Sequence, residues 1–163
     1  MKEIIYFAKI KKGAVIPSKR EEDGCYDIYP CFEEKSMVIH PGDIVMVPTG
    51  IASAFRKGLR IQLRERGSTG TIGMARRAGE IDSGYRGEWF VAINNTTKKQ
   101  IIISKEADKA HERENLVLYP YTKAIAQAAV EYVPETTEMQ VTLDELKEFK
   151  SERGEGKLGS SKK

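Results

Sequence analysis

The sequence predicts a mostly β domain of the sandwich or barrel type. About ten short segments rich in β-branched and aromatic residues follow one another closely, divided by turns that contain glycine or proline. Few segments favour helix. The clearest strand is L-R-I-Q-L-R at residues 59–64, where every second residue is apolar, as on a half-buried strand.

Length and composition indicate one domain followed by an arm. The 163 residues can build one substantial core, and the sequence has no internal repeat and no sign of a second domain. Residues 151–163, S-E-R-G-E-G-K-L-G-S-S-K-K, contain almost no apolar side chains, so we expect a flexible C-terminal arm there. The folded domain is therefore expected over residues 1–150.

Composition disfavours several classes of protein. With 40% hydrophobic and 31% charged residues the chain is typical of a soluble globular protein, and its net charge of +3 gives no reason to expect a nucleic-acid partner. No apolar run is long enough for a membrane span, and the charged first ten residues are too short for a signal peptide. Cys25 and Cys31 are expected as reduced thiols of a cytoplasmic protein, although their spacing leaves a disulfide open. His40 and His111 stand alone, which disfavours a histidine metal site.

The first half of the chain contains strand-like segments at residues 3–10, 36–40, 44–55 and 59–64, with a turn at 41–43 and a break at 48–50. Another lies in G-C-Y-D-I-Y-P at residues 24–30. Alternation there places Asp27 on the side opposite to Tyr26 and Ile28.

In the second half, residues 79–88 predict a tight bend and not a continuous strand, followed by a buried strand at 89–93 and strands at 100–104 and 116–119. The charged residues 105–115 fit one helical turn or an extended loop. For the alanine-rich residues 123–133 helix is possible, but the β-branched and aromatic residues at their end favour strand. Thr142 and Glu145 have capping-box spacing, which predicts one short helix.

The bend at residues 79–88, G-E-I-D-S-G-Y-R-G-E, is the first candidate site. A carboxylate held there, on Asp82, beside the aromatic Tyr85 and exposed backbone amides, could orient a water over a small ligand. Alternatively, Asp82 only caps its own backbone in an Asx turn.

Four further elements have chemistry that suits a polyphosphate. The loop Arg66-Gly67-Ser68 offers a guanidinium, hydroxyls and free amides, unless it is a plain hairpin turn. Gln127 is the one polar side chain of an apolar run, and either a ligand role or a structural hydrogen bond explains it. Asp27 could hold hydrated Mg²⁺ or be a surface partner. Arg153 and the glycines and serines after it could fold over phosphates or be a linker.

Taken in order, G-C-Y-D-I, R-G-S-T-G, G-E-I-D-S-G-Y-R-G, A-I-A-Q and R-G-E-G-K-L-G-S-S resemble the five ordered motifs of the trimeric dUTP pyrophosphatase (dUTPase) family. The resemblance spans nearly the whole chain, and the central motif is its most specific part. It implies a jelly-roll β-barrel with at most one short helix and a homotrimer with active sites at subunit interfaces. It also implies hydrolysis of dUTP to dUMP and pyrophosphate with Mg²⁺ as cofactor, in the cytoplasm of a cell or of a phage host.

The resemblance also implies residue roles. Asp82 would be the general base for the attacking water, Tyr85 would pack under the deoxyribose, and Asp27 would sit near Mg²⁺ through water. The remaining expected substrate-binding residues are those that read uracil, bind phosphates or close over the site: Arg66, Gly67, Ser68, Gly79, Glu80, Ile81, Gln127, Arg153, Leu158, Gly159, Ser160 and Ser161.

The chain departs from the family pattern in several places. The second motif usually reads R-S-G, so the hydroxyl of Ser68 is displaced by one position. A second acidic residue often stands where this chain has Gly84, and an arginine is missing from T-K-A-I before the fourth motif. Leu158 replaces the aromatic that typically stacks on uracil, and because leucine can cover the base but cannot stack on it, the stacking term of roughly 1 kcal/mol or more would be weakened. The charged residues 105–115 have no assigned counterpart.

Two other functions compete with dUTP hydrolysis. The related dCTP deaminases carry a catalytic glutamate at the position of Ala92, so deamination is disfavoured. A non-catalytic regulator that binds a nucleotide or a protein through the same scaffold is the other alternative. The presence of Asp82 argues against a purely binding role.

Overall fold

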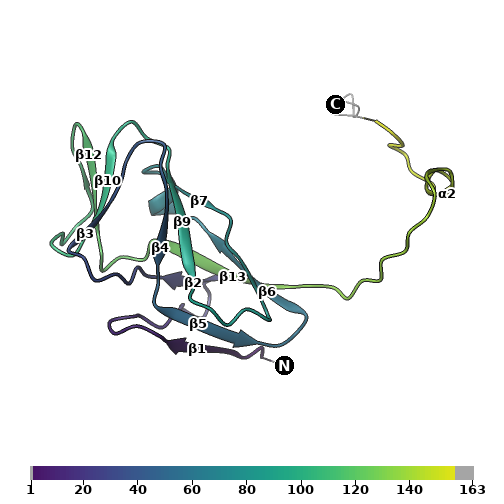
Figure 1. Cartoon of the computed structure of the whole chain (residues 1–163), viewed down its shortest axis with the longest axis horizontal. Helices are drawn as coiled ribbons and strands as arrows, with labels where there is room; N and C mark the ends of the chain where they lie inside the picture. The colour runs from purple at the N-terminus through teal and green to yellow at the C-terminus, as the bar shows by residue number, and fades with distance from the viewer. Residues whose placement is uncertain (1, 157–163) are drawn as a thin grey trace.

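The computed structural model describes residues 2–156 and confirms a mostly β fold. Within these residues thirteen short strands form four small sheets, arranged as Figure 1 shows. The strands are β1 (Ile5–Lys9), β2 (Cys25–Ile28), β3 (Ser36–Ile39), β4 (Ile44–Pro48), β5 (Ile51–Phe55), β6 (Leu59–Arg64), β7 (Met74–Arg77), β8 (Glu80–Asp82), β9 (Phe90–Asn95), β10 (Gln100–Ser104), β11 (His111–Glu112), β12 (Leu116–Pro120) and β13 (Ala126–Tyr132).

The sheets join segments that are far apart in the sequence. Their strand orders are β2-β13-β6-β8, β4-β9-β7, β11-β12-β10-β3 and β1-β5. All pairings are antiparallel except that of β10 with β12. The preference for strand over helix at residues 123–133 is confirmed, because β13 lies between β2 and β6.

The β2-β13-β6-β8 sheet has one apolar and one polar face. Ile28, Leu63, Ile61 and Ile81 point into the core and are at most 6% exposed. Side chains alternate along a strand, so the residues between them face the other way. The polar face of this sheet therefore carries Asp27, Gln127, Asp82 and their neighbours, in agreement with the predicted alternation around Asp27.

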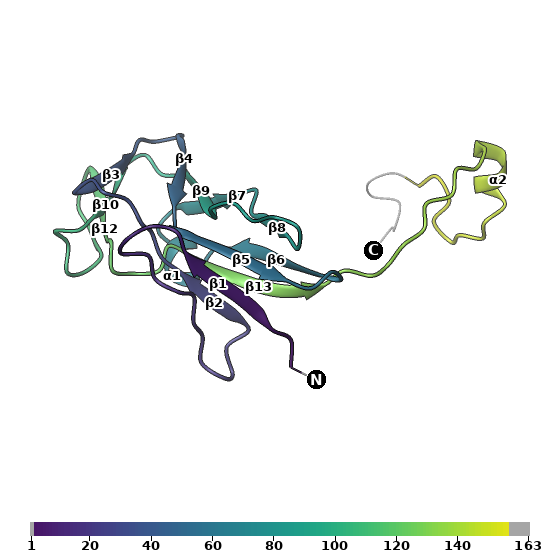
Figure 2. The ribbon, with the colours of Figure 1, turned by 60° about the horizontal axis from the view of Figure 1, so that its bottom comes forward.

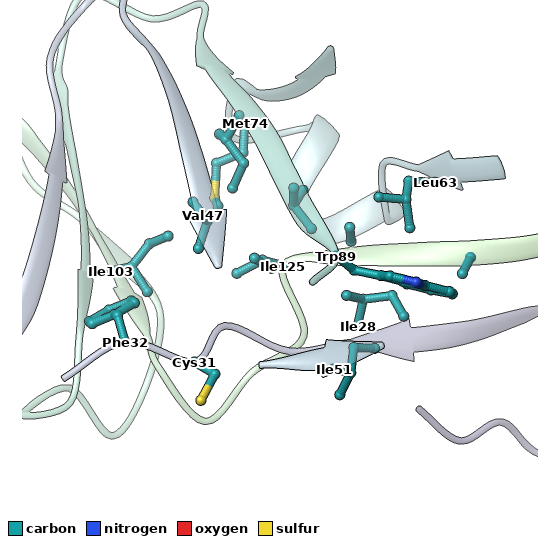
Figure 3. Close-up of a cluster of buried hydrophobic side chains, with 14 of the residues drawn as sticks. Ile28, Cys31, Phe32, Val47, Ile51, Leu63, Met74, Trp89, Ile103 and Ile125 are labelled. Atoms are coloured by element: carbon teal, nitrogen blue, oxygen red, sulfur yellow. The ribbon is translucent and has the colours of Figure 1, made fainter. Parts of the chain in front are cut away.

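The core lies between the sheets and is centred on Trp89, which is fully buried. The Phe7 ring meets the indole edge to face, with centroids 5.6 Å apart. Figure 3 shows the indole extending between Leu63 and Ile28. Burying one large apolar side chain contributes about 1.5–3 kcal/mol, so this cluster fixes the strands on either side of the central bend.

The expectation of at most one short helix is wrong, because the described residues contain two. The predicted helix forms as α2 (Leu143–Lys147), with the expected capping box: Thr142 Oγ1 accepts from the Glu145 amide at 3.2 Å, and the Thr142 amide donates to Glu145 Oε2 at 2.8 Å. The second is α1 (Gly67–Gly70), a single turn in the glycine- and hydroxyl-rich loop. The fully buried Thr69 explains it, since Thr69 Oγ1 bonds both the amide and the carbonyl of Arg66.

Two further details differ from the sequence prediction. The bend begins with a true strand, β8, which pairs with β6. Strand β7 was not predicted at all. For the charged residues 105–115 the loop alternative holds, with the two-residue strand β11 inside the loop. Cys25 and Cys31 are free thiols, as expected.

After β13 the chain leaves the sheets. Figures 1 and 2 both show the segment beyond Tyr132 running outward, with α2 well away from the strands. The apolar residues of α2 and its flanks are exposed, among them Leu143 and Phe149. Within the described residues, no helix is long and apolar enough to cross a membrane.

Candidate active site

The central bend is built on the pairing of β8 with β6. Asp82 lies directly opposite Arg60, and its side chain is exposed at the end of β8. The Tyr85 amide then donates to the Asp82 carbonyl at 3.0 Å, which closes the turn. Because Asp82 is fixed by this pairing, its carboxylate is held outward, clear of the core.

Glycine is required where the chain enters the bend. Gly79 has a φ of +103°, which other residues rarely adopt, and its carbonyl accepts from the Leu63 amide at 2.8 Å. A Cβ at this position would lie 2.8 Å from Leu63 Cβ. The glycine therefore lets the backbone of residues 79–81 approach β6 closely.

Tyr85 lies across the backbone of the same bend. Its hydroxyl donates to the Glu88 carbonyl at 2.8 Å, and the residue remains 43% exposed. A Cβ at Gly87 would stand 2.5 Å from Tyr85 Oη, so only glycine allows this position of the ring. The bend thus presents an exposed aromatic residue three positions after Asp82.

Arg66 and Asp27 form the centre of a second cluster. Arg66 Nε donates to Asp27 Oδ1 at 2.9 Å, and Nη2 donates to Oδ2 at 3.3 Å. Arg66 Nη1 lies 3.4 Å from both Ser68 Oγ and the Ala124 carbonyl oxygen. About two thirds of each charged side chain is buried, which strengthens the interaction over that of an exposed pair.

Gln127 belongs to this cluster and is also structurally bonded. Its Nε2 donates to the Glu65 carbonyl at 2.7 Å, so the structural alternative holds for that atom. Gln127 is opposite Asp27 on β2 and Arg64 on β6. With Asp27, Arg66, Gly67 and Ser68 it lines one open depression of about 670 Å³, which the loop at residues 18–20 also borders.

The two clusters share one face of the sheet but are separated along it. Arg60, opposite Asp82, and Arg64, opposite Gln127, are four residues apart on β6, which corresponds to about 13 Å along the strand. Within one chain the exposed carboxylate of Asp82 therefore does not reach the depression around Arg66. Asp82 and Glu80 line a different hollow, with residues 133–137 on its other side.

Glu131 links the two ends of β6. It faces Arg60, whose Nε donates to Glu131 Oε2 at 3.0 Å, and it also accepts from Arg64. The hydrogen bonds from Arg60, reinforced by Arg64, hold the pKa of the Glu131 carboxyl below its usual value against the opposing effect of desolvation. The same hydrogen bond raises the pKa of Arg60.

Asp27 places a carboxylate in the depression around Arg66, where it could serve a metal ion. No three His, Cys, Asp or Glu side chains gather into a metal cage within residues 2–156. Mg²⁺ needs no such cage, since it usually keeps several waters and takes one or two carboxylates plus substrate phosphates. Arg66 occupies one acceptor position on each Asp27 oxygen, which leaves the carboxylate able to hold water in the depression. The donor set therefore fits Mg²⁺ bound through water.

Of the expected arm residues, only Arg153 is described. Its Nε donates to the Gly156 carbonyl at 2.9 Å, on the segment that runs away from the sheets (Figure 2). Arg153 thus contacts neither cluster of its own chain. Leu158, Gly159, Ser160 and Ser161 lie outside the described residues.

Sequence reasoning missed three charged residues near the bend. Arg60 and Glu131 alternate with buried residues on their strands, but their contact became visible only once β6 and β13 were known to pair. Glu88 ends the predicted bend, and the sequence alone assigns it no role. Its side chain is nevertheless only 13% exposed.

The sequence is similar to those of known dUTPases. The family model for dUTPase matches residues 11–110. The deoxyuridine 5'-triphosphate nucleotidohydrolase of Leptospira interrogans is 31% identical over 103 residues, which cover 61% of this chain and 70% of that protein. The enzyme of the same name from Nautilia profundicola is 28% identical over 159 residues, or 95% of this chain and 96% of its own.

Solved structures share the fold. A mutant dUTPase of phage 80alpha superposes with a TM-score of 0.74 at 22% identity, covering 98% of this chain and 99% of its own. The dUTPase of phage phi11 of S. aureus gives a TM-score of 0.68 at 17% identity, covering 85% of this chain and 96% of its own. These likenesses confirm the expected dUTPase-like fold.

Proposed function

The chain belongs to the dUTPase family, and we propose that it hydrolyses dUTP to dUMP and pyrophosphate by attack of water on the α-phosphorus. The observation that carries this proposal is the geometry of the central bend. Asp82 ends β8 with an exposed carboxylate, and three residues later Tyr85 lies on Gly87 as a flat aromatic surface. The relatives named deoxyuridine 5'-triphosphate nucleotidohydrolase support the choice of substrate.

The bend supplies the nucleoside half of the site. The backbone of residues 79–81 would read the uracil edge, and the Tyr85 ring would pack under the deoxyribose, where a ribose 2′-OH would collide with it. Asp82 would accept a proton from the attacking water. A positioned general base of this kind accelerates a reaction about 10²–10⁴-fold.

The cluster around Arg66 supplies the phosphate half. Water attack on a phosphoanhydride needs positioning and neutralisation of charge more than covalent chemistry. The Arg66 guanidinium, the Ser68 hydroxyl and the amides of Gly67 and Ser68 are donors suited to phosphate oxygens, and the carbonyl of the Gln127 side chain would orient water or a donor beside them. Asp27 would hold the hydration shell of Mg²⁺, which when bound neutralises charge on the phosphate oxygens.

We infer a homotrimer, because one chain does not bring both halves together. Asp82 and the Arg66 cluster are about 13 Å apart along β6, so a neighbouring copy would supply the phosphate half to each bend. The outward face of the β4-β9-β7 sheet exposes Ile44, Met46 and Phe90, which supports burial against another copy. The arm with Arg153 and Ser160-Ser161 would close over the β- and γ-phosphates of a neighbouring site. A nucleotide substrate of this kind favours action in the cytoplasm.

One assay separates this function from its competitors. The protein is incubated with dUTP, dCTP and dTTP in Mg²⁺, and pyrophosphate and ammonia are followed separately. We expect pyrophosphate from dUTP alone, and loss of turnover in Asp82→Asn. Ammonia from dCTP would replace the proposal by a deaminase, although Ala92 is buried between Met46 and Arg77 and offers no acid there. No turnover with any nucleotide would favour a non-catalytic regulator.

A further inference from the structure

Glu88 is the last residue of the central bend and is bound to two segments that the proposed reaction does not use. Its Oε1 accepts a hydrogen bond from the Gly50 amide at 2.9 Å. Its Oε2 lies 2.9 Å from Lys11 Nζ, and the Glu88 side chain is only 13% exposed. A largely buried carboxylate with an amide donor and a cation is held much more firmly than a surface pair.

Gly50, whose amide binds the Glu88 side chain, cannot shift easily. Gly50 has a φ of +67°, and a Cβ there would lie 2.9 Å from both Ala14 Cβ and Cys31 Sγ. The Gly50 carbonyl accepts from the Ile10 amide at 2.8 Å. Glu88 is therefore anchored to a closely packed turn between β4 and β5.

Glu88 also contacts Tyr85, through its main chain. The main-chain carbonyl of Glu88 accepts the Tyr85 hydroxyl at 2.8 Å. Beyond it, Trp89 is fixed because its amide donates to the Ile51 carbonyl at 2.9 Å. Glu88 thus anchors the C-terminal end of the bend, and the position of its carbonyl determines the position of the Tyr85 hydroxyl.

We propose that Glu88 is a positioning residue that sets the orientation of Tyr85 through the bonds to Gly50 and Lys11. The inference rests on the proposed function, because it gives Glu88 a part in selecting deoxyribose over ribose. Asp82 does not depend on this anchor, since the pairing of β8 with β6 holds it. Loss of the anchor should therefore affect sugar selection more than the turnover of bound dUTP.

The test compares kcat and KM for dUTP and UTP in the full-length protein and in three variants. Glu88→Gln keeps an oxygen for the Gly50 amide but loses the ion pair, Lys11→Met loses only the ion pair, and Glu88→Ala loses both contacts. We expect the preference for dUTP over UTP in kcat/KM to fall about tenfold in Glu88→Ala, the loss expected for one hydrogen bond to a charged group. In Glu88→Gln and Lys11→Met the preference for dUTP should fall less. The kcat for dUTP should change little in all three variants.

The matched control is Lys12→Met, which removes the same charge from the neighbouring exposed position and should keep the full preference. If Glu88→Ala lowers kcat for both nucleotides equally and leaves the preference intact, Glu88 is only structural and the inference is overturned. If the wild type turns over neither nucleotide, the proposed function fails separately. Hydrogen exchange of the backbone amides then tests the inference. We expect residues 83–88 to exchange faster in Glu88→Ala than in the wild type, and unchanged exchange would overturn the inference.

Discussion

Arg66 and Asp27 lie 39 residues apart in the chain and are joined by two hydrogen bonds, of 2.9 Å and 3.3 Å. Arg66 follows β6 and Asp27 lies on β2, with β13 between the two strands. The pair turns the guanidinium toward the depression that Ser68 and Gln127 also line. The first and second sequence motifs, which contain Asp27 and Arg66, therefore form one structural unit.

This geometry predicts that Arg66→Lys is not a conservative change. Lysine keeps the charge but lacks the planar fork that bonds both Asp27 oxygens and also reaches Ser68 Oγ through Nη1. We expect kcat/KM for dUTP to fall about 10- to 100-fold, as for loss of charge-assisted hydrogen bonds. Steady-state kinetics at saturating Mg²⁺ measures this change.

Arg56→Lys is the matched control. Arg56 also bonds both oxygens of a carboxylate, that of Glu3, but it does so beside β1 and away from both clusters. Its kcat/KM should stay within about twofold of wild type, because a surface pair contributes little. Equal losses in the two variants would show that the Arg66 effect is not specific to the site.

The fold was largely predictable because its strands are short alternating or apolar runs divided by turn residues. Residues 59–64 are an example, since three of their side chains are buried and three face outward on β6. The capping box at Thr142 was predictable because it depends on residues three positions apart. Features set by local sequence were therefore recovered.

Features that depend on distant contacts were not predictable. The helical turn α1 forms around the buried hydroxyl of Thr69, and nothing in G-S-T-G marks that threonine as internal. Strand β8 exists only because β6 pairs with it. The pairing of Glu131 with Arg60 likewise requires knowing which strands are neighbours. Local pattern identifies the motifs, and the sheet order determines which of them meet.

The contact between Tyr85 and Gly87 predicts a strong effect of a single methyl group. In Gly87→Ala the new Cβ would stand 2.5 Å from Tyr85 Oη and 2.7 Å from Cζ, so the ring must move and lose its bond to the Glu88 carbonyl. We expect kcat/KM for dUTP to fall about 10- to 100-fold, since small misplacements at a site cost this much. Gly84→Ala is the control within the same bend, because no atom lies within 4 Å of its Cβ. An unchanged kcat/KM for dUTP in Gly87→Ala would show that Tyr85 is not part of the site.

The hydrogen bonds of Glu131 predict a pH-dependent contribution to stability. Arg60 and Arg64 lower the pKa of this carboxyl from 4.5, so its contribution is fully present above about 4.5 and is lost as pH falls through the lowered value. Relative to Glu131→Gln, the wild type should be more stable to urea at neutral pH, and the difference should vanish in acid. Glu135→Gln, at an exposed pair with Lys57, should show little difference at any pH. A wild-type advantage that persisted in strong acid would contradict this assignment.

We expect the C-terminal arm, residues 151–163, to be needed for turnover and not for folding. The β-sheets end with β13 at Tyr132, so removal of residues 151–163 leaves every described strand and α2 intact. We expect the truncated protein to keep the trimer mass in light scattering and its unfolding transition. Turnover of dUTP should nevertheless fall by about 10²-fold or more, because donors that close over the phosphates and exclude water would be missing. Arg153→Ala in the full-length chain tests one of these donors alone and should give a smaller loss of the same kind. Full activity of the truncated trimer would show that the arm is a linker and that the phosphates are bound by the Arg66 cluster alone.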